Sequence, residues 1–120
     1  MRVVHDPSDG TERRTLATDV HVADGFWAKF RGLRGRSSIP ADFALVFPFE
    51  AVGRRDIDMV FVRTPIDVVW VRDGDVQQVS TLRSWIGFGL AKADCVIELP
   101  PGGADDVEVG DRVVLEDDNA

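Results

Sequence analysis

The most unusual carboxylate of the sequence is Asp67, which lies in the run IDVVWV at residues 66–71. Successive residues of a strand point to opposite faces of a sheet, so Asp67 shares a face with Val69 and Val71. A carboxylate on an apolar face must be hydrogen-bonded or lie near the open end of the sheet. Two interpretations follow. Asp67 accepts backbone N–H groups from a neighbouring loop, or it acts as a ligand anchor or general base.

Glu98 is a second carboxylate in an apolar strand, where it shares a face with Val96. If Asp67 and Glu98 met, repulsion between them would raise the pKa of one of them, as in enzymes that use paired carboxylates. Asp67 and Glu98 are therefore weak catalytic candidates for a hydrolase or lyase. The alternative is a salt bridge from Glu98 to an arginine.

Arginines and one tryptophan supply the remaining candidates for binding. The arginines of interest in the middle of the chain are Arg31, Arg34, Arg36, Arg54, Arg55, Arg63 and Arg83. Around one cleft they could bind a carboxylate or phosphate through forked hydrogen bonds, or they could pair with surface aspartates. Trp85 lies in a glycine-containing loop, where it could close over a pocket or pack the loop against the sheet. The predicted ligand-binding residues are Arg36, Asp58, Met59, Arg63, Asp67 and Trp85.

The sequence offers little for nucleophilic or metal chemistry. Cys95 lies in an apolar strand and is predicted to be an inert small hydrophobe. The two histidines, His5 and His21, are far from it in the sequence and too few to support a catalytic metal site. A glycine-rich phosphate loop is also missing, so we expect no cofactor and no metal.

Short strands make up most of the expected structure. The predicted strands cover residues 1–5, 12–22, 43–49, 56–62, 66–71, 75–81, 93–99 and 112–115. Asp73-Gly74 lies between two β-branched runs, which is a strong hairpin signal. Asp24 is the predicted N-cap of a short helix with an apolar stripe of Phe26, Trp27, Phe30 and Leu33. These elements predict a mainly β (α+β) fold: a small antiparallel β-sandwich or distorted barrel with one short helix packed on it.

Composition bounds the class of protein. The chain has 120 residues, with 14 Lys and Arg against 21 Asp and Glu, and a formal net charge of -7. This predicts a single domain over residues 1–120. The acidic balance argues against nucleic acid as a partner. No apolar run approaches the ~18 residues that span a bilayer, and the N-terminus lacks an apolar signal core, so we expect a soluble cytoplasmic protein without a membrane partner. Scarce lysine and abundant aspartate indicate adaptation to salt or a GC-rich genome.

An ordered series of short motifs resembles domain-of-unknown-function family 192 (DUF 192). The motifs are GLRGRSSIP (32–40), FALVFPF (43–49), Met59, TPIDVVWVRDG (64–74), ADCVIELPPG (93–102) and VGDRVVL (109–115). The resemblance covers about residues 20–116, which leaves 117–120 as a frayed acidic tail. It implies a compact fold related to a jelly-roll-like sandwich and no established activity. Two departures, at residues 32–34 and 58–62, mean that no role of the family's Asn or His there can be carried over.

Three functional hypotheses remain. The leading one is a binding module for a small polar or anionic ligand or a peptide. The alternatives are a carboxylate-based enzyme using Asp67 or Glu98, and a homo-oligomeric or partner-docking protein. The sequence leaves the oligomeric state open.

Overall fold

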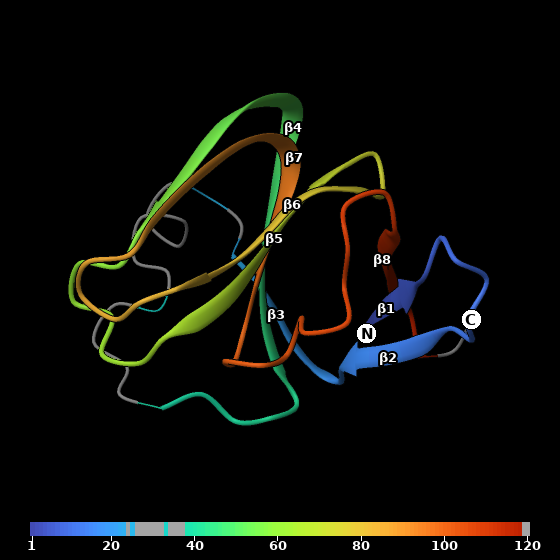
Figure 1. Cartoon of the computed structure of the whole chain (residues 1–120), viewed down its shortest axis with the longest axis horizontal. Coiled ribbons are helices and arrows are strands. Elements are labelled where there is room, and N and C mark those ends of the chain that lie inside the picture. Colours follow the sequence, from blue (N-terminus) through green and yellow to red (C-terminus); the bar gives the residue numbers. More distant parts are fainter. Residues whose placement is uncertain (24, 26–32, 34–37, 119–120) are drawn as a thin grey trace.

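The computed structural model describes residues 1–23, 25, 33 and 38–118, and within them it is built from strands (Figure 1). The eight strands are β1 (Arg2–Asp6), β2 (Arg14–Ala17), β3 (Asp19–Val22), β4 (Phe43–Asp58), β5 (Ile66–Arg72), β6 (Asp75–Leu82), β7 (Phe88–Leu99) and β8 (Arg112–Glu116). They form one sheet in the order β2-β1-β8-β6-β5-β7-β4-β3. The β3–β4 pair is parallel and the other pairs are antiparallel, so the sheet is mixed.

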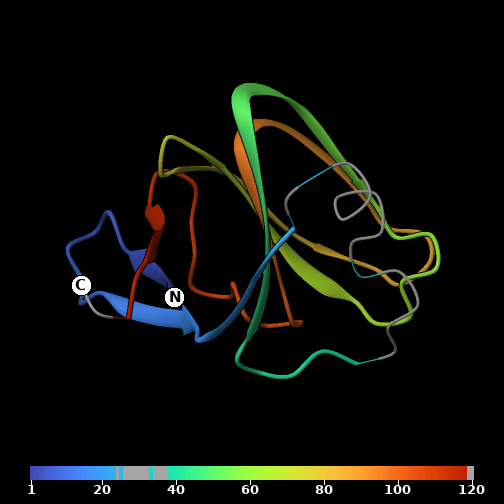
Figure 2. The same ribbon diagram turned by 180° about the vertical axis from the view of Figure 1, so that it is seen from behind.

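The two edges of this sheet are consecutive in the chain. β2 ends at Ala17 and β3 begins at Asp19, so only Thr18 separates the strands that begin and end the sheet order. The N–H groups of Thr18 and Asp19 both donate to the carbonyl of Asp42, at 3.0 and 2.9 Å. The sheet therefore curls back on itself (Figures 1 and 2), although no ladder of the described residues closes it.

Two hydrophobic clusters lie on opposite faces of the sheet, and β5 contributes to both. Ile66, Val68 and Trp70 belong to one cluster, while Val69 and Val71 belong to the other. This division confirms the alternation predicted from the sequence. A long run of apolar residues in one strand therefore reflects burial on both sides.

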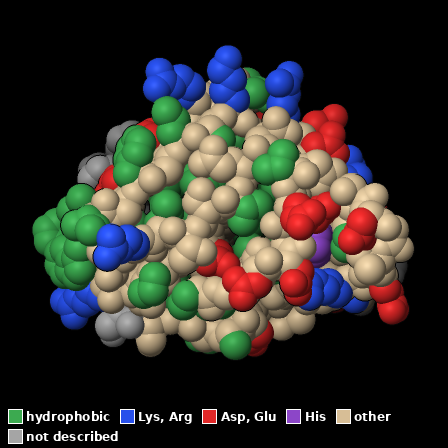
Figure 3. All heavy atoms as spheres, in the orientation of Figure 1, with side chains coloured by type: hydrophobic (Ala, Val, Ile, Leu, Met, Phe, Trp, Pro, Cys, Tyr) green, Lys and Arg blue, Asp and Glu red, His purple; other side chains and the backbone are tan. Residues whose placement is uncertain are grey.

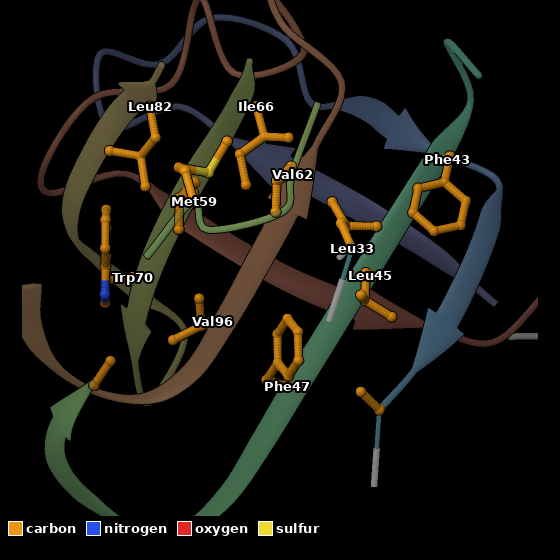
Figure 4. Packing of buried hydrophobic residues seen from close by; sticks show 13 residues of the cluster. Leu33, Phe43, Leu45, Phe47, Met59, Val62, Ile66, Trp70, Leu82 and Val96 are labelled. Atoms are coloured by element: carbon orange, nitrogen blue, oxygen red, sulfur yellow. The ribbon is translucent and has the colours of Figure 1, made fainter. Parts of the chain in front are cut away.

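Among the described residues Trp70 is the largest fully buried side chain, and it belongs to the first cluster (Figure 4). Its indole N–H donates to the carbonyl of Arg55 at 2.8 Å, which satisfies its single polar atom. Gly89 lies against the ring, and a Cβ on this glycine would come within 2.4 Å of Trp70 Cη2. A residue without a side chain is therefore required beside the tryptophan.

The β5–β6 hairpin is confirmed, and the extent of β4 is a correction. Asp73 and Gly74 have φ values of +51° and +84°, as a two-residue hairpin turn of this type requires. The two strands predicted over 43–49 and 56–62 are instead one strand of 16 residues that ends at Asp58. A register shift between Pro48 and Gly53 lets the strand continue past the proline.

The predicted helix is not supported. Of residues 25–36 only Gly25 and Leu33 are described, so most of this prediction lies outside the described residues. Gly25 has a φ of +100°, which a right-handed helix does not allow. Leu33 is buried in the first cluster, as expected for the apolar stripe. The described chain contains no helix, and hence none long and apolar enough to cross a membrane.

Candidate functional site

Two loops at one end of the sheet are bonded to each other through their backbones. They are the β4–β5 loop (residues 59–65) and the β6–β7 loop (residues 83–87). The N–H of Met59 donates to the carbonyl of Gly87, and the N–H of Trp85 donates to the carbonyl of Val62, both at 3.1 Å. Each loop supplies one donor and one acceptor, so the two loops are joined at two points.

Buried side chains and a close backbone contact also support the two loops from below. Met59 is fully buried, and its side chain lies among Leu82, Ile66 and Val62 (Figure 4). Gly87 lies so close to the chain before it that a Cβ would come within 2.6 Å of the backbone N and O of Arg83. The tight turn that carries Trp85 therefore depends on a glycine at position 87.

Phe61 and Trp85 are both held in a left-handed backbone conformation. Their φ values are +63° and +66°, a region that bulky side chains rarely adopt. Each such residue costs of the order of 1–3 kcal/mol and persists only where its surroundings enforce it. The two rings make an edge-to-face contact, with centroids 5.6 Å apart and planes at 66°. Two strained aromatic residues therefore meet where the loops join.

The two loops and the first residue of β7 expose large apolar side chains to solvent. These side chains, together called the aromatic tip, are 47–72% exposed and belong to Val60, Phe61, Trp85, Ile86 and Phe88. In Figure 3 hydrophobic side chains gather at the left end, where Figure 1 places these loops. An exposed apolar patch on a small domain marks a site of interaction.

Positive charge lies beside the aromatic tip. Arg63 and Arg83, one from each loop, are exposed. Among the described residues neither guanidinium has an ion-pair partner. Asp58 also lies here, and its Oδ1 accepts the N–H of Val60 at 3.1 Å. This end of the molecule thus combines apolar rings with two arginines that can meet an anionic group.

Of the six predicted ligand-binding residues, the structure describes five. Asp58, Met59, Arg63 and Trp85 belong to the two joined loops or border them. Met59 is below the surface, whereas Trp85 is on it. Arg36 lies outside the described residues. The remaining predicted ligand-binding residue, Asp67, faces the second cluster, whereas Met59 belongs to the first.

Asp67 is 2% exposed, and its two carboxylate oxygens receive separate donors. The hydroxyl of Thr81 donates to Oδ1 at 2.8 Å, and the backbone N–H of Ala104 donates to Oδ2 at 2.9 Å. Ala104 belongs to the second cluster, together with Val69 and Val71. Asp67 therefore ties the segment after β7 to the sheet, which corresponds to the first of the two interpretations from the sequence.

Asp67 and Glu98 lie on opposite faces of the sheet. The β5–β7 ladder pairs Asp67 with Leu99 and Val68 with Glu98. Since paired residues share a face, Glu98 faces the first cluster and Asp67 the second. Glu98 is itself buried, at 4% exposure. The two carboxyl groups thus cannot form the pair that the enzyme hypothesis requires.

A cleft of about 500 Å³ lies at the other end of the molecule, and the sequence did not predict it. Its lining includes His5, Arg14, Asp106, Glu108 and Asp111. Buried His5 contacts Asp111 through Nε2 and Oδ2 at 2.7 Å, although the residues are 106 positions apart. On its other side, His5 Nδ1 receives Arg14 Nε at 3.4 Å. The Gly-Asp motif near the C-terminus was the one signal that could have drawn attention to Asp111.

Hydrogen bonds hold Asp111 in its ionised form. Burial opposes its charge, but backbone N–H groups of Ser8 and Glu108 donate to it, as do the Ser8 hydroxyl and His5. Together these donors lower the pKa of Asp111 well below its usual range. Asp111 therefore connects the N-terminal strand and turn to the turn before β8.

The described residues offer no metal centre and no activated thiol. No three of their His, Cys, Asp and Glu side chains are arranged to hold a metal ion. Burial, with the nearby charge of Asp94, raises the pKa of the Cys95 thiol to about 11. A thiol that stays protonated near neutral pH is a poor nucleophile.

A family model and two curated relatives match the sequence. The model of the DUF192 family, described as "Uncharacterized ACR", matches residues 8–115. The chain is 35% identical over 107 residues to a UPF0127 protein of Thermococcus gammatolerans (86% of this chain, 70% of the relative). It is 28% identical over 112 residues to one of Thermococcus sibiricus (88% and 71%).

Two solved structures share the fold. One is from Sinorhizobium meliloti, described as a "putative transcription regulator", with a TM-score of 0.79 and 21% identity over 94% of this chain and 91% of that one. The other is a protein of unknown function from Novosphingobium aromaticivorans, with a TM-score of 0.82 and 18% identity over 96% and 84%. At these identities the likeness establishes the fold alone.

Proposed function

Because the chain belongs to DUF192, an uncharacterised family, we propose a function from its surface geometry: it is a binding module that holds an apolar, negatively charged partner at the aromatic tip. The observation that carries this proposal is the contact between exposed Phe61 and Trp85, both in left-handed conformations. Strain of this kind is expected where a loop must present a side chain in a fixed position.

The surroundings of this contact support the same reading. The cross-loop hydrogen bonds join the two backbone segments that carry the rings, which reduces the conformational entropy lost on binding. Arg63 and Arg83 supply charge-assisted hydrogen bonds for an anionic group beside the apolar surface. The tip thus provides both the apolar and the charged contacts that a specific binding site needs.

The positions of Asp67 and Glu98 favour a binding function over catalysis by a pair of carboxylates. A general acid–base pair must bring both groups to one substrate. Here the two carboxyl groups face different clusters, and both oxygens of Asp67 have donors. Neither residue belongs to the aromatic tip.

A small probe with the same chemistry tests the proposal. Anilinonaphthalene sulfonate combines aromatic rings with one negative charge, and its fluorescence rises when it binds apolar surface. We expect it to bind the whole chain, with amide NMR shifts concentrated in the two loops. Ile86→Ser, which removes the most exposed side chain of the tip (72%), is expected to weaken binding.

Val109→Ser is the matched control, because Val109 is also an exposed aliphatic residue (65%) but does not belong to the tip. The control is expected to bind the probe as the wild type does. Equal losses in the two variants, or NMR shifts confined to other parts of the chain, would refute the proposed site.

A further inference from the structure

We infer that the partner of the aromatic tip is the interface of a lipid bilayer with anionic headgroups. This inference rests on the binding function proposed above and names its partner. The sequence predicts no membrane partner because it lacks a run that could span a bilayer. Association with a bilayer surface needs no such run.

Part of the backbone of the tip has hydrogen bonds that would persist in a medium of low polarity. Six N–H groups of the two loops donate hydrogen bonds to acceptors in the loops or directly beside them. They belong to Met59, Val60, Val62, Trp85, Ile86 and Gly87. An unsatisfied N–H is costly in a medium without water, and these groups would not become unsatisfied. They are also unavailable to an extended peptide, which would depend on main-chain hydrogen bonds. The remaining N–H groups of the two loops, including that of Phe61, have no hydrogen-bond partner among the described residues, so the case for lipid rests on the side chains of the tip.

The exposed side chains are of the types that bind bilayer interfaces. Trp is favoured there because its ring contacts acyl chains while its N–H stays near the headgroups, and Phe adds apolar surface on the inserted side. Ile86, beside Trp85, supplies a purely aliphatic group on the same loop. Because the two loops are hydrogen-bonded to each other, their exposed side chains can enter the interface together.

Charge is distributed along the molecule in the direction that such binding requires. Arg63 and Arg83 lie beside the tip, as does Asp58, whereas a larger group of acidic side chains lies near the opposite end, around the cleft that includes Asp106, Glu108 and also Arg14 (Figure 3). The longest extent of the molecule is 37 Å. Since screening at physiological salt acts over ~8 Å, a net charge of -7 does not prevent the basic end from approaching an anionic surface.

Sedimentation of the full chain with vesicles tests the inference. The two vesicle types are pure phosphatidylcholine, and phosphatidylcholine with phosphatidylglycerol in equal parts. We expect binding to the mixed vesicles that weakens as salt is added. Ile86→Ser should weaken this binding about tenfold, because it removes the apolar area that one aliphatic side chain would bury in the bilayer. Val109→Ser should leave it unchanged.

Charge variants test the anionic component. Arg63→Gln and Arg83→Gln should each weaken binding to the mixed vesicles about fivefold, as for one basic residue near an anionic bilayer. Arg72→Gln, at the far end of β5, is the matched control and should have no effect. Losses of equal size in all three variants would mean that the protein binds by net charge alone, which would overturn the inference.

Fluorescence quenching by brominated lipid tests insertion. Trp70 is fully buried, whereas Trp85 is 49% exposed at the tip. Trp27 lies outside the described residues, so it is replaced by Phe in every protein of this experiment. We expect quenching in Trp27→Phe and its loss in Trp27→Phe/Trp85→Phe, which keeps an aromatic ring at position 85 and should still sediment. If quenching persists in the double variant, the tip is not the inserted part and the inference is wrong.

The experiments separate this inference from the proposed function. If the sulfonate probe binds at the tip but neither vesicle does, the lipid inference fails and the binding module stands. A peptide from a display library that binds wild type but not Ile86→Ser, without vesicle binding, would assign the tip to a protein partner instead. If Ile86→Ser changes neither probe nor vesicle binding, both proposals fail.

Discussion

Replacing Asp67 separates a structural from a functional role for this buried carboxylate. Asp67→Ala removes the acceptor for the Thr81 hydroxyl and for the N–H of Ala104, which itself is 3% exposed. The exposed Thr81 hydroxyl can turn to water, but the buried N–H of Ala104 cannot. We therefore expect most of the loss of stability to come from Ala104.

The magnitude follows from the two hydrogen bonds. A buried donor left unsatisfied costs roughly 1–3 kcal/mol, and a hydrogen bond to a charged group contributes roughly 1.5–3 kcal/mol. Asp67→Ala should therefore lower the free energy of unfolding by about 3 kcal/mol, or the Tm by about 10 °C. Asp67→Asn keeps the shape and one acceptor, so it should cost about 2 kcal/mol. Thr81→Val should cost about 1 kcal/mol.

Urea unfolding followed by circular dichroism measures these differences. The double variant Asp67→Ala/Thr81→Val should lose less than the sum of the single variants, because both remove the same hydrogen bond. Binding of the sulfonate probe at the tip should be unchanged in the folded variants. A loss below about 1 kcal/mol in Asp67→Ala, together with loss of probe binding, would refute the structural role.

Four further predictions concern stability and reactivity. Because the pKa of Asp111 is lowered in the folded protein, its ionised carboxylate stabilises the fold above the unfolded pKa of ~3.9, and this stabilisation is lost as the pH falls further. Asp111→Asn should therefore make the free energy of unfolding depend less steeply on pH in the acid range. An unchanged slope would contradict this. Gly89→Ala should lower the free energy of unfolding by about 1–3 kcal/mol in thermal melts, because its Cβ meets Trp70; an unchanged Tm would contradict the packing. Cys95, with a pKa of about 11, should react with Ellman's reagent far more slowly than free glutathione at pH 8, and equal rates would show an exposed thiolate. Phe61→Gly should be more stable than Phe61→Ala by about 1 kcal/mol in urea, since only glycine relieves a φ of +63°; equal stabilities would mean that no strain is stored there.

The strands could be predicted where local chemistry decides the structure. Alternation in β5 correctly assigned Val69 and Trp70 to different faces. The Asp73-Gly74 turn identified the β5–β6 hairpin, because few residues adopt positive φ at both positions. β4 was divided in two because Pro48 normally interrupts a sheet, and only the partner strand reveals a register shift that accommodates it.

The candidate site was less accessible to prediction because it depends on contacts distant in sequence. The left-handed conformation of Phe61 contradicts its intrinsic preference, and it is stabilised by hydrogen bonds between two loops that the sequence treats separately. Trp85 was recognised as a loop aromatic, but its partner Phe61 was placed in a strand. His5 and Asp111 meet only because β1 and β8 are neighbours in the sheet.

The stability of the sheet explains how the strain at the tip can be retained. Two left-handed aromatic residues cost together about 2–6 kcal/mol, a large share of the 5–15 kcal/mol by which domains are stable. Phe61 and Trp85 recover little of this by burial, since both remain about half exposed. Glycine at either position would relieve the strain and remove the ring. The exposed rings of Phe61 and Trp85 therefore do not serve the stability of a fold that already packs Met59 and Trp70 well. An exposed ring contributes free energy when it contacts a partner, and binding is the process that accounts for keeping the two rings.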